Sequence, residues 1–410
     1  MVIHGTGCCL VDFLYANEDF SSPAFKAARS RAEGDGGLTP GKLVFAEDFE
    51  RFIGKPYEEA LGELTGHKPC TSYNLGGPSV VSLAHAAQVL GGEHRVSFFG
   101  VKGGDSSAAL VEKALASLPF APVRLVEKEG ATPRTDVLSD PNYDGGHGER
   151  TFINLLGAAA NLKAEDLSNF PSENSPASPM EPPPEDFYDA DIIAFGGTGL
   201  TPLLHDGLTS LLERARKRDA ATVVNLVYDY RSENAAPGKK WKLGVNDDAY
   251  PFIDLLIADR EEALRTSGLS VPKDAAAWFL GRGAGAVIIT DGVRPAILCA
   301  GKKGVFTPLP LRTLPVSEKI DEDLAAHPGR RGDTTGCGDN LAGGVIAGMA
   351  EQLSRVKRGA ADLRECVVMG IVSGGFACFT VGGTWYESRA GEKRSLLEPY
   401  LAAYRGQIGL

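Results

Sequence analysis

The sequence predicts an α/β fold in which a mostly parallel sheet is covered by helices on both of its faces. Short apolar runs rich in β-branched residues alternate with longer amphipathic runs along most of the 410 residues, and this alternation is typical of strand–helix–strand units. A Gly-rich turn opens the amphipathic run at residues 339–353, and the start of a helix is a natural anion site in such folds.

The order of the predicted elements follows from these runs. The apolar runs predict strands at residues 2–4, 96–99, 192–195, 222–227, 255–258 and 287–290. Apolar residues at helical spacing predict helices at residues 79–90, 106–117, 203–217, 260–266 and 339–353.

Three segments interrupt the alternation. Residues from about 13 to 60 and from 131 to 158 predict β-rich or irregular insertions. Residues 168–185 are rich in proline, serine and glutamate, which predicts an exposed loop that does not pack into a core.

Composition excludes several classes of protein. The formal net charge of −11 leaves no global basic field to attract nucleic acid or a membrane surface. The seven cysteines are scattered, without a C-x-x-C pair, so we expect a reduced, cytoplasmic setting. No apolar run reaches membrane length, and the first residues lack the pattern of a signal peptide.

The most informative motif is the heptad at residues 333–339, which reads D-T-T-G-C-G-D. Glycines at positions 336 and 338 let a ligand approach the free backbone amides at the start of the following helix. These amides and the helix dipole suit a phosphate group, and Asp339 in the first turn is placed to take a proton from a hydroxyl. The alternative is a helix-capping aspartate after a Gly-rich turn, with no ligand.

The heptad resembles the C-terminal signature D-T-x-G-A-G-D of the ribokinase-like (PfkB) carbohydrate and nucleoside kinase family, with Cys337 in place of the usual alanine. The resemblance implies one domain over residues 1–410, built as a ribokinase-like three-layer sandwich with a small β-rich lid formed by segments 13–60 and 131–158. It also implies that Asp339 is the catalytic base and that the amides of Gly336, Cys337 and Gly338 form an anion hole.

The resemblance assigns the acceptor side to the N-terminal part of the chain. It implies that Asp12, expected at the carboxyl end of the first strand, binds substrate hydroxyls together with the Gly76-Gly77 turn. Val81 stands where the family has a sugar-binding Asn, and Asn74, Ser79 and Ser82 are candidates to replace that contact. Arg150 lies in a segment similar to the family's lid, and we expect it to be a surface or lid residue.

The resemblance places the cofactors between these two regions. ATP is expected to contact Asp259, Thr290, Gly292 and Thr334. Glu262 would organise water around Mg²⁺, and the main chain near Asp333 would hold a monovalent cation such as K⁺. The competing interpretation is that Asp259 and its neighbouring acids only cap a helix.

The sequence therefore predicts an ATP-dependent kinase that phosphorylates a hydroxymethyl group of a sugar or related polyol. A nucleoside kinase is an alternative, because residues 38–52 resemble the adenosine-kinase branch. A catalytically silent sugar- or nucleotide-binding protein is a further alternative, since positions 81, 259 and 295 depart from the family pattern. Lids of this family often pair two subunits, so a homodimer through the lid is also expected.

Overall fold

The computed structural model describes residues 1–410 except 33, 121, 147 and 169–185. Within these residues the larger sheet has nine strands in the order β14-β13-β12-β11-β10-β9-β1-β5-β6. Neighbouring strands from β6 to β12 are parallel, and β13 and β14 extend one edge as antiparallel strands. The strands are β1 (Val2–Gly7), β5 (Arg95–Lys102), β6 (Val123–Glu127), β9 (Ile192–Gly196), β10 (Ala221–Asn225), β11 (Leu255–Asp259), β12 (Ala286–Asp291), β13 (Arg294–Ala300) and β14 (Leu309–Leu314).

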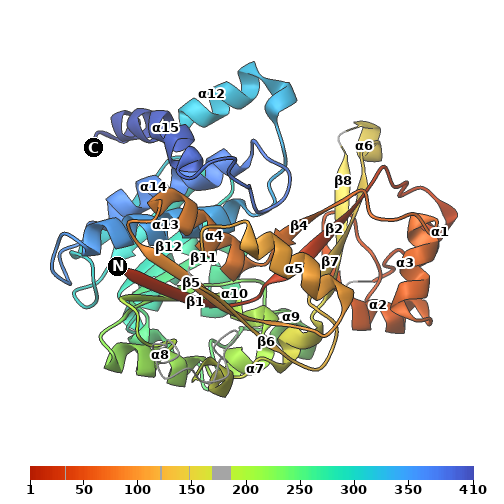
Figure 1. The fold of residues 1–410 in the computed structure, drawn as a ribbon, viewed down its shortest axis with the longest axis horizontal. Helices are drawn as coiled ribbons and strands as arrows, with labels where there is room; N and C mark the ends of the chain where they lie inside the picture. The colour runs from red at the N-terminus through yellow and green to blue at the C-terminus, as the bar shows by residue number, and fades with distance from the viewer. Residues whose placement is uncertain (33, 121, 147, 169–185) are drawn as a thin grey trace, which may run out of the picture.

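Helices cover both faces of this sheet, so the fold has three layers (Figure 1). Side chains alternate along each strand, and in β9 Ile192 and Ala194 join one apolar core while Ile193 and Phe195 join the other. The first core is closed by α4 (Pro78–Leu90), α5 (Ser106–Ala116), α12 (Glu318–Ala326), α13 (Cys337–Leu353), α14 (Leu363–Ala377) and α15 (Glu392–Ile408). The second is closed by α7 (Pro202–Asp206), α8 (Leu208–Lys217), α10 (Arg260–Ser267) and α11 (Pro272–Gly281).

A second sheet stands beside the first (Figure 1). Its strand order among the described residues is β3-β8-β7-β2-β4, and we call this sheet with its helices the lid. The strands are β2 (Leu10–Ala16), β3 (Leu43–Phe45), β4 (Ser72–Gly76), β7 (Arg134–Asp140) and β8 (Glu149–Leu155). The helices are α1 (Pro23–Ala28), α2 (Ala46–Ile53), α3 (Tyr57–Thr65) and α6 (Tyr143–Gly146), and α9 (Tyr230–Ala235) contacts the lid through a stacked Phe45–Tyr230 pair.

The segment at residues 13–60 differs from the expected β-rich or irregular insertion, because α1, α2 and the start of α3 occupy much of it. These helices have only six to nine residues, and over so short a run a helical period is hard to distinguish from a strand or an irregular segment. Their buried side chains form a separate core that includes Phe25, Phe49 and Leu61.

Within the described part of the chain, the backbone passes between the two sheets four times, and the crossings contact each other in pairs. Gly77 has a φ of +105°, and a Cβ there would lie 2.6 Å from the carbonyl oxygen of Cys8. Gly157 has a φ of +49°, and a Cβ there would lie 2.0 Å from the carbonyl oxygen of Ala131. Only glycine fits such close backbone contacts, so the sheets are joined at two tightly packed points.

The remaining predictions of local structure have mixed outcomes. Each predicted strand is present, but the helix expected over 203–217 is divided at Gly207 into α7 and α8. The loop expected over 168–185 lies, apart from Ser168, outside the described residues. None of the helices that the structure describes is both long and apolar enough to cross a bilayer.

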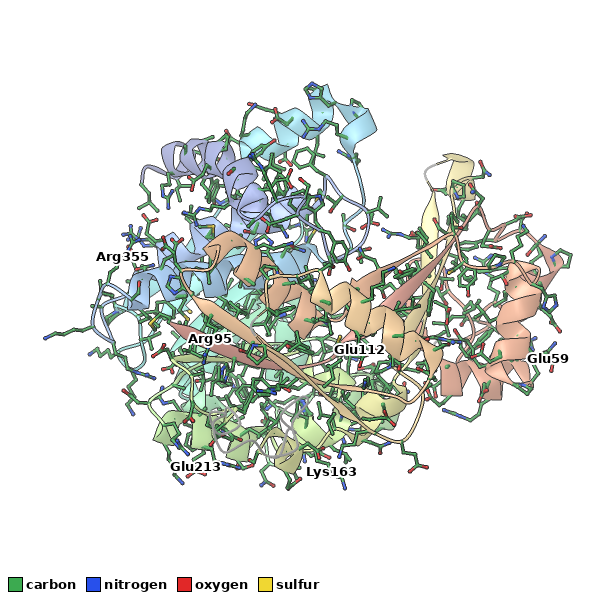
Figure 2. The ribbon with its side chains drawn as sticks, in the orientation of Figure 1. Glu59, Arg95, Glu112, Lys163, Glu213 and Arg355 are labelled. Atoms are coloured by element: carbon green, nitrogen blue, oxygen red, sulfur yellow. The ribbon has the colours of Figure 1, made fainter. Side chains whose placement is uncertain are left out.

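Charged side chains are spread over separate regions of the surface. Figure 2 shows Glu59 on α3 at the far side of the lid, Lys163 beside the layer of α7 and α8, and Arg355 just after α13. All three are exposed.

Candidate active site

The turn at residues 333–336 leads directly into α13. Gly336 is the N-cap residue with a φ of +74°, and a Cβ there would lie 2.5 Å from Cα of Gly383. Glycine at 336 is therefore required by backbone conformation and by packing. A Cβ at Gly338 would meet no atom within 4 Å, so position 338 is the one that opens the turn toward a ligand.

The backbone amides of this turn are partly engaged. The amide of Cys337 donates to the carbonyl of Thr334 at 3.3 Å, and the amide of Asn340 donates to the carbonyl of Gly336 at 2.8 Å. The amides of Gly338 and Asp339 are first-turn donors without an intrahelical acceptor. Thr334 is exposed, and the helix N-terminus remains suited to an anion.

Asp339 lies in the first turn of α13, as the sequence predicts. Burial raises the pKa of its carboxyl from 3.8 to about 6. A carboxylate that titrates near neutrality is a competent general base.

Buried polar groups support this turn from behind. Asn340 donates to the carbonyls of Gly336 and Gly383 at 2.8 and 2.9 Å, and its side-chain oxygen accepts from Lys393 at 3.2 Å. Lys393 also donates to Gln88 at 2.9 Å, and burial lowers its pKa to about 7. Sequence reasoning missed this network, because its members come from three helices and no local motif marks them.

Asp12 is not at the carboxyl end of the first strand, and that expectation is wrong. β1 ends at Gly7 and the chain crosses into the lid, where Asp12 lies inside β2 opposite Asn74. A Cβ on Gly76 would lie 2.2 Å from the Asp12 carboxylate. Gly76 therefore leaves the space that this carboxylate occupies.

The structure nevertheless brings Asp12 close to the heptad. Burial raises the pKa of Asp12 to about 7, and the nearby negative charges of Asp339 and Asp333 add to the rise. A hydrogen bond with Thr135 acts in the opposite direction. Two regions more than three hundred residues apart in sequence thus form one acidic site.

A cavity of about 580 Å³ lies between the lid and the C-terminal part of the chain, and we call it the pocket. Its polar lining includes Asp12, Asn74, Arg150, Asp333 and Thr335. Asp339 is outside this lining, although its charge acts on Asp12. The volume is that of a small-molecule site.

Arg150 links the lid to the heptad. From β8 it donates to the Asp333 carboxylate at 2.8 Å and to the Thr335 hydroxyl at 2.9 Å. Asp333 also accepts from the amides of Thr335 at 2.7 Å and Gly382 at 3.2 Å. Arg150 is a lid residue as predicted, but sequence reasoning did not predict that it contacts the heptad.

Val81 does not reach the pocket. It is 1% exposed in the first core, and a Cβ on Gly383 would lie 3.2 Å from its side chain. Among the three candidates to replace the missing Asn, Ser79 and Ser82 donate to the backbone carbonyls of Thr6 and Pro78. Asn74 lines the pocket and donates to the carbonyl of Thr384 at 3.0 Å.

Three of the four predicted nucleotide residues gather at the carboxyl ends of β11 and β12, whereas Thr334 lies in the heptad before α13. Asp259 caps α10, and it forms a reciprocal pair with Glu262: the Glu262 amide donates to Asp259 at 2.7 Å and the Asp259 amide donates to Glu262 at 2.8 Å. Thr290 is the register partner of Asp259, and Gly292 follows in a turn with a φ of +58°. Asp259 therefore caps a helix, as the competing interpretation expects. Its role in nucleotide binding stays a prediction.

The acidic groups fit an incoming magnesium–nucleotide complex. Burial raises the pKa of Glu262 to about 8, and the charges of Asp259 and Asp339 add to the rise. Among the described residues, no three His, Cys, Asp or Glu side chains are grouped closely enough to hold a metal. Carboxylate oxygens such as these are the kind of ligand that Mg²⁺ takes, and the ion usually keeps several waters.

A comparison with protein families now assigns the chain. The profile described as pfkB family carbohydrate kinase matches residues 44–317. The chain belongs to this family. The match begins after Asp12 and ends before the heptad. These two parts of the site in this pfkB kinase therefore lie outside the matched residues.

Solved structures agree with this assignment. An adenosine kinase from Schistosoma mansoni in complex with 2-fluoroadenosine has a TM-score of 0.66 at 16% identity, covering 94% of this chain and 97% of that one. An adenosine kinase from Sinorhizobium meliloti has a TM-score of 0.63 at 17% identity, with 97% and 98% covered. A ribokinase from Thermotoga maritima has a TM-score of 0.56 at 16% identity, with 98% and 99% covered. No curated protein matches the chain.

These likenesses establish the ribokinase-like fold of this pfkB kinase and confirm the predicted fold class. Kinases of the family transfer a phosphoryl group from ATP, typically with Mg²⁺, to a small-molecule acceptor. Phosphotransfer is therefore the reaction class of the chain. The similar structures include both a ribokinase and adenosine kinases. They therefore do not identify the acceptor, which has to be inferred from the pocket.

Proposed function

We propose that this protein is an ATP-dependent kinase that phosphorylates a hydroxymethyl group of a sugar or related polyol. The observation that carries the proposal is that Asp12 lines the same pocket as Asp333 and Thr335 of the heptad, while the charge of Asp339 in the first turn of α13 acts on Asp12. One carboxylate can orient an acceptor and the other can activate it, next to amides that suit a phosphoryl group.

In the proposed reaction, Asp12 accepts hydrogen bonds from acceptor hydroxyls and directs the hydroxymethyl group toward the heptad. Asp339 removes the hydroxyl proton as the new P–O bond forms. The free amides of Gly338 and Asp339 and the positive end of α13 stabilise the charge on the transferring group. Glu262 and Asp259 would hold the water around Mg²⁺, and the ion, when bound, would neutralise negative charge on the phosphates.

The pH profile tests the carboxylates together. We expect kcat/KM to rise with pH and level off between pH 6 and 8, because Asp339, with a pKa of about 6, acts only when ionised. Ionisation of Asp12, near 7, adds to the upper part of the rise. In Asp12→Asn the rate falls and the remaining profile keeps the limb near pH 6. Steady-state rates from pH 5 to 8.5 measure this, and a flat profile would exclude both carboxylates.

The acceptor is best identified with a panel under one ATP-consumption assay. Free pentoses, hexoses, polyols and nucleosides are compared with Mg²⁺ and K⁺ present. We expect turnover with a sugar or polyol that carries a free hydroxymethyl group. ATP consumption with nucleosides alone would identify the protein as a nucleoside kinase. No ATP consumption with any acceptor would favour a catalytically silent binding protein.

A nucleoside acceptor remains the second candidate because of the pocket's aromatic side chains. Tyr73 comes from the lid strand β4, and Trp385 and Tyr386 come from the segment after α14. Tyr73 is 43% exposed and Tyr386 is 37% exposed, so their rings have free surface. Such rings can stack on a base, whereas a small sugar has no comparable aromatic surface.

Replacing Tyr73 by Ala separates these two candidates. If the acceptor is a nucleoside, we expect its KM to rise about 10- to 100-fold, because stacking contributes roughly 1–3 kcal/mol per base. If the acceptor is a free sugar, we expect KM to change less than about threefold. The KM for ATP is the internal control and should not change. An unaltered nucleoside KM would remove the case for stacking on Tyr73.

A further inference from the structure

Cys337 is one of two cysteines whose sulfur atoms meet at the base of the anion site. It is the first residue of α13, and Cys378 caps the C-terminal end of α14. Their Sγ atoms are 3.5 Å apart, and both residues are partly exposed. The helices approach closely here, since a Cβ on Gly374 would lie 2.9 Å from the carbonyl oxygen of Cys337.

The other five cysteines have different surroundings. Cys8, Cys9, Cys299 and Cys366 are buried, and burial raises the pKa of each. Cys70 is partly exposed, and its pKa is also raised by burial. The described sulfur-to-sulfur hydrogen bond is that of Cys337 and Cys378.

The Cys378 thiol is the more acidic member of the pair. Its pKa is lowered to about 7, because the Cys337 thiol donates to its thiolate and the positive charge of Arg331 lies nearby. Burial and the charges of Asp321 and Asp333 act in the opposite direction. A partly exposed thiolate is the form that reacts with peroxides, so Cys378 is the sulfur expected to react first.

We propose that Cys337 and Cys378 form an oxidation-sensitive dithiol, which closes to a disulfide and switches off the adjoining anion site. The oxidant is a hydroperoxide, with hydrogen peroxide as the simplest case. The Cys378 thiolate attacks one peroxide oxygen, the O–O bond breaks, and the leaving hydroxide takes a proton to become water. The Cys337 sulfur then attacks the sulfenic acid, the S–S bond forms, and a second water leaves. Two thiols are thus oxidised as one peroxide is reduced to two waters.

Closure requires movement at the helix start. A disulfide has an S–S distance of about 2.0 Å, whereas the sulfurs are 3.5 Å apart, so one or both helix ends must shift. Cys337 precedes Gly338 and Asp339 directly, and their amides are the free donors of the turn. A displacement of about 1 Å in a site that positions reactants can lower the rate about 100-fold. This effect on rate rests on the proposed kinase function, whereas disulfide formation does not.

The test treats the purified full-length protein with hydrogen peroxide and then with dithiothreitol. Peptide mass spectrometry after alkylation should show residues 337 and 378 joined, with the loss of two hydrogen atoms. We expect ATP-dependent turnover to fall at least tenfold with the same time course and to return on reduction. Cys378→Ala should keep the untreated rate and resist peroxide, and Cys70→Ala should respond like the unaltered protein.

The results test disulfide formation and its effect on turnover separately. The rate of Cys337→Ala is compared before and after peroxide treatment, and it should also be resistant. This second variant keeps the test decisive if Cys378→Ala folds poorly. Absence of the joined peptide would overturn the dithiol, whatever the acceptor. A joined peptide with unchanged turnover would overturn the switch, and equal inactivation of Cys378→Ala would place the sensitive group elsewhere. Failure of the kinase proposal itself appears earlier, as no turnover in the reduced protein.

Discussion

Replacing Asp339 by Asn should lower kcat by on the order of 1,000-fold or more, because the amide cannot take the hydroxyl proton. The dissociation constant of ATP should stay within about threefold, since the amides and helix dipole at the start of α13 remain. Steady-state kinetics and isothermal titration calorimetry with ATP measure the two effects separately.

The matched control is Asp274→Asn. Asp274 is also a first-turn carboxylate, on α11, but it is exposed and lies on the other helical layer. It should leave both kcat and ATP affinity unchanged. Near-normal turnover in Asp339→Asn would end the assignment of Asp339 as the base.

The same substitution should stabilise the protein, and the gain should depend on pH. The folded-state pKa of Asp339 is about 6 against an ordinary 3.8, so between these values the folded state binds the proton more tightly than the unfolded chain. Stability therefore falls as pH rises from about 4 to 6, by on the order of 1–3 kcal/mol. Thermal melts should show a higher Tm for Asp339→Asn at pH 7.5 and little difference near pH 4.

The second large effect is expected for Arg150→Met, which should lower kcat/KM by about 100-fold. The substitution keeps much of the side-chain length but removes the donors to Asp333 and Thr335. A partly buried Asp333 is then left without its cation, and the negative charge around Asp12 grows. Kinetics should show changes in both kcat and the acceptor KM, because the same contact joins the lid to the heptad.

Two further variants serve as controls for Arg150→Met. Arg150→Lys should recover only part of the loss, since an ammonium group cannot reproduce the fixed fork of a guanidinium. Arg51→Met removes an exposed lid arginine that pairs with Asp48 within α2, and it should be neutral. If Arg150→Met lowers Tm sharply while kcat per folded molecule is unchanged, Arg150 has a structural role only.

Local sequence was sufficient for six strands of the central sheet and for the heptad, but it missed β6 and the antiparallel strands β13 and β14. The strands of the parallel sheet are continuous apolar runs, and the turn before α13 is specified by its own glycines and aspartate. Asp12 was recognised as a candidate but assigned to the wrong sheet, because β1 and β2 are separated only by Cys8 and Cys9 and read as one strand region.

The residues that sequence reasoning missed act through distant partners. The contact of Arg150 with Asp333 and that of Lys393 with Asn340 join separate elements. Cys337 was noted only as a small residue, because its neighbour Cys378 is brought to it by the packing of α14 on α13. Such pairs leave no periodic signal in a single sequence, and only the folded chain reveals them.

The two glycine-packed crossings between the sheets also constrain how the lid can move. Gly77 lies on Cys8, and Gly157 lies on Ala131. Side chains add further contacts between the lid and the rest of the chain, since Phe45 stacks on Tyr230 and Asn74 donates to the carbonyl of Thr384. A side chain at either glycine would push the two sheets apart. It would therefore also disturb the alignment of Arg150 with Asp333.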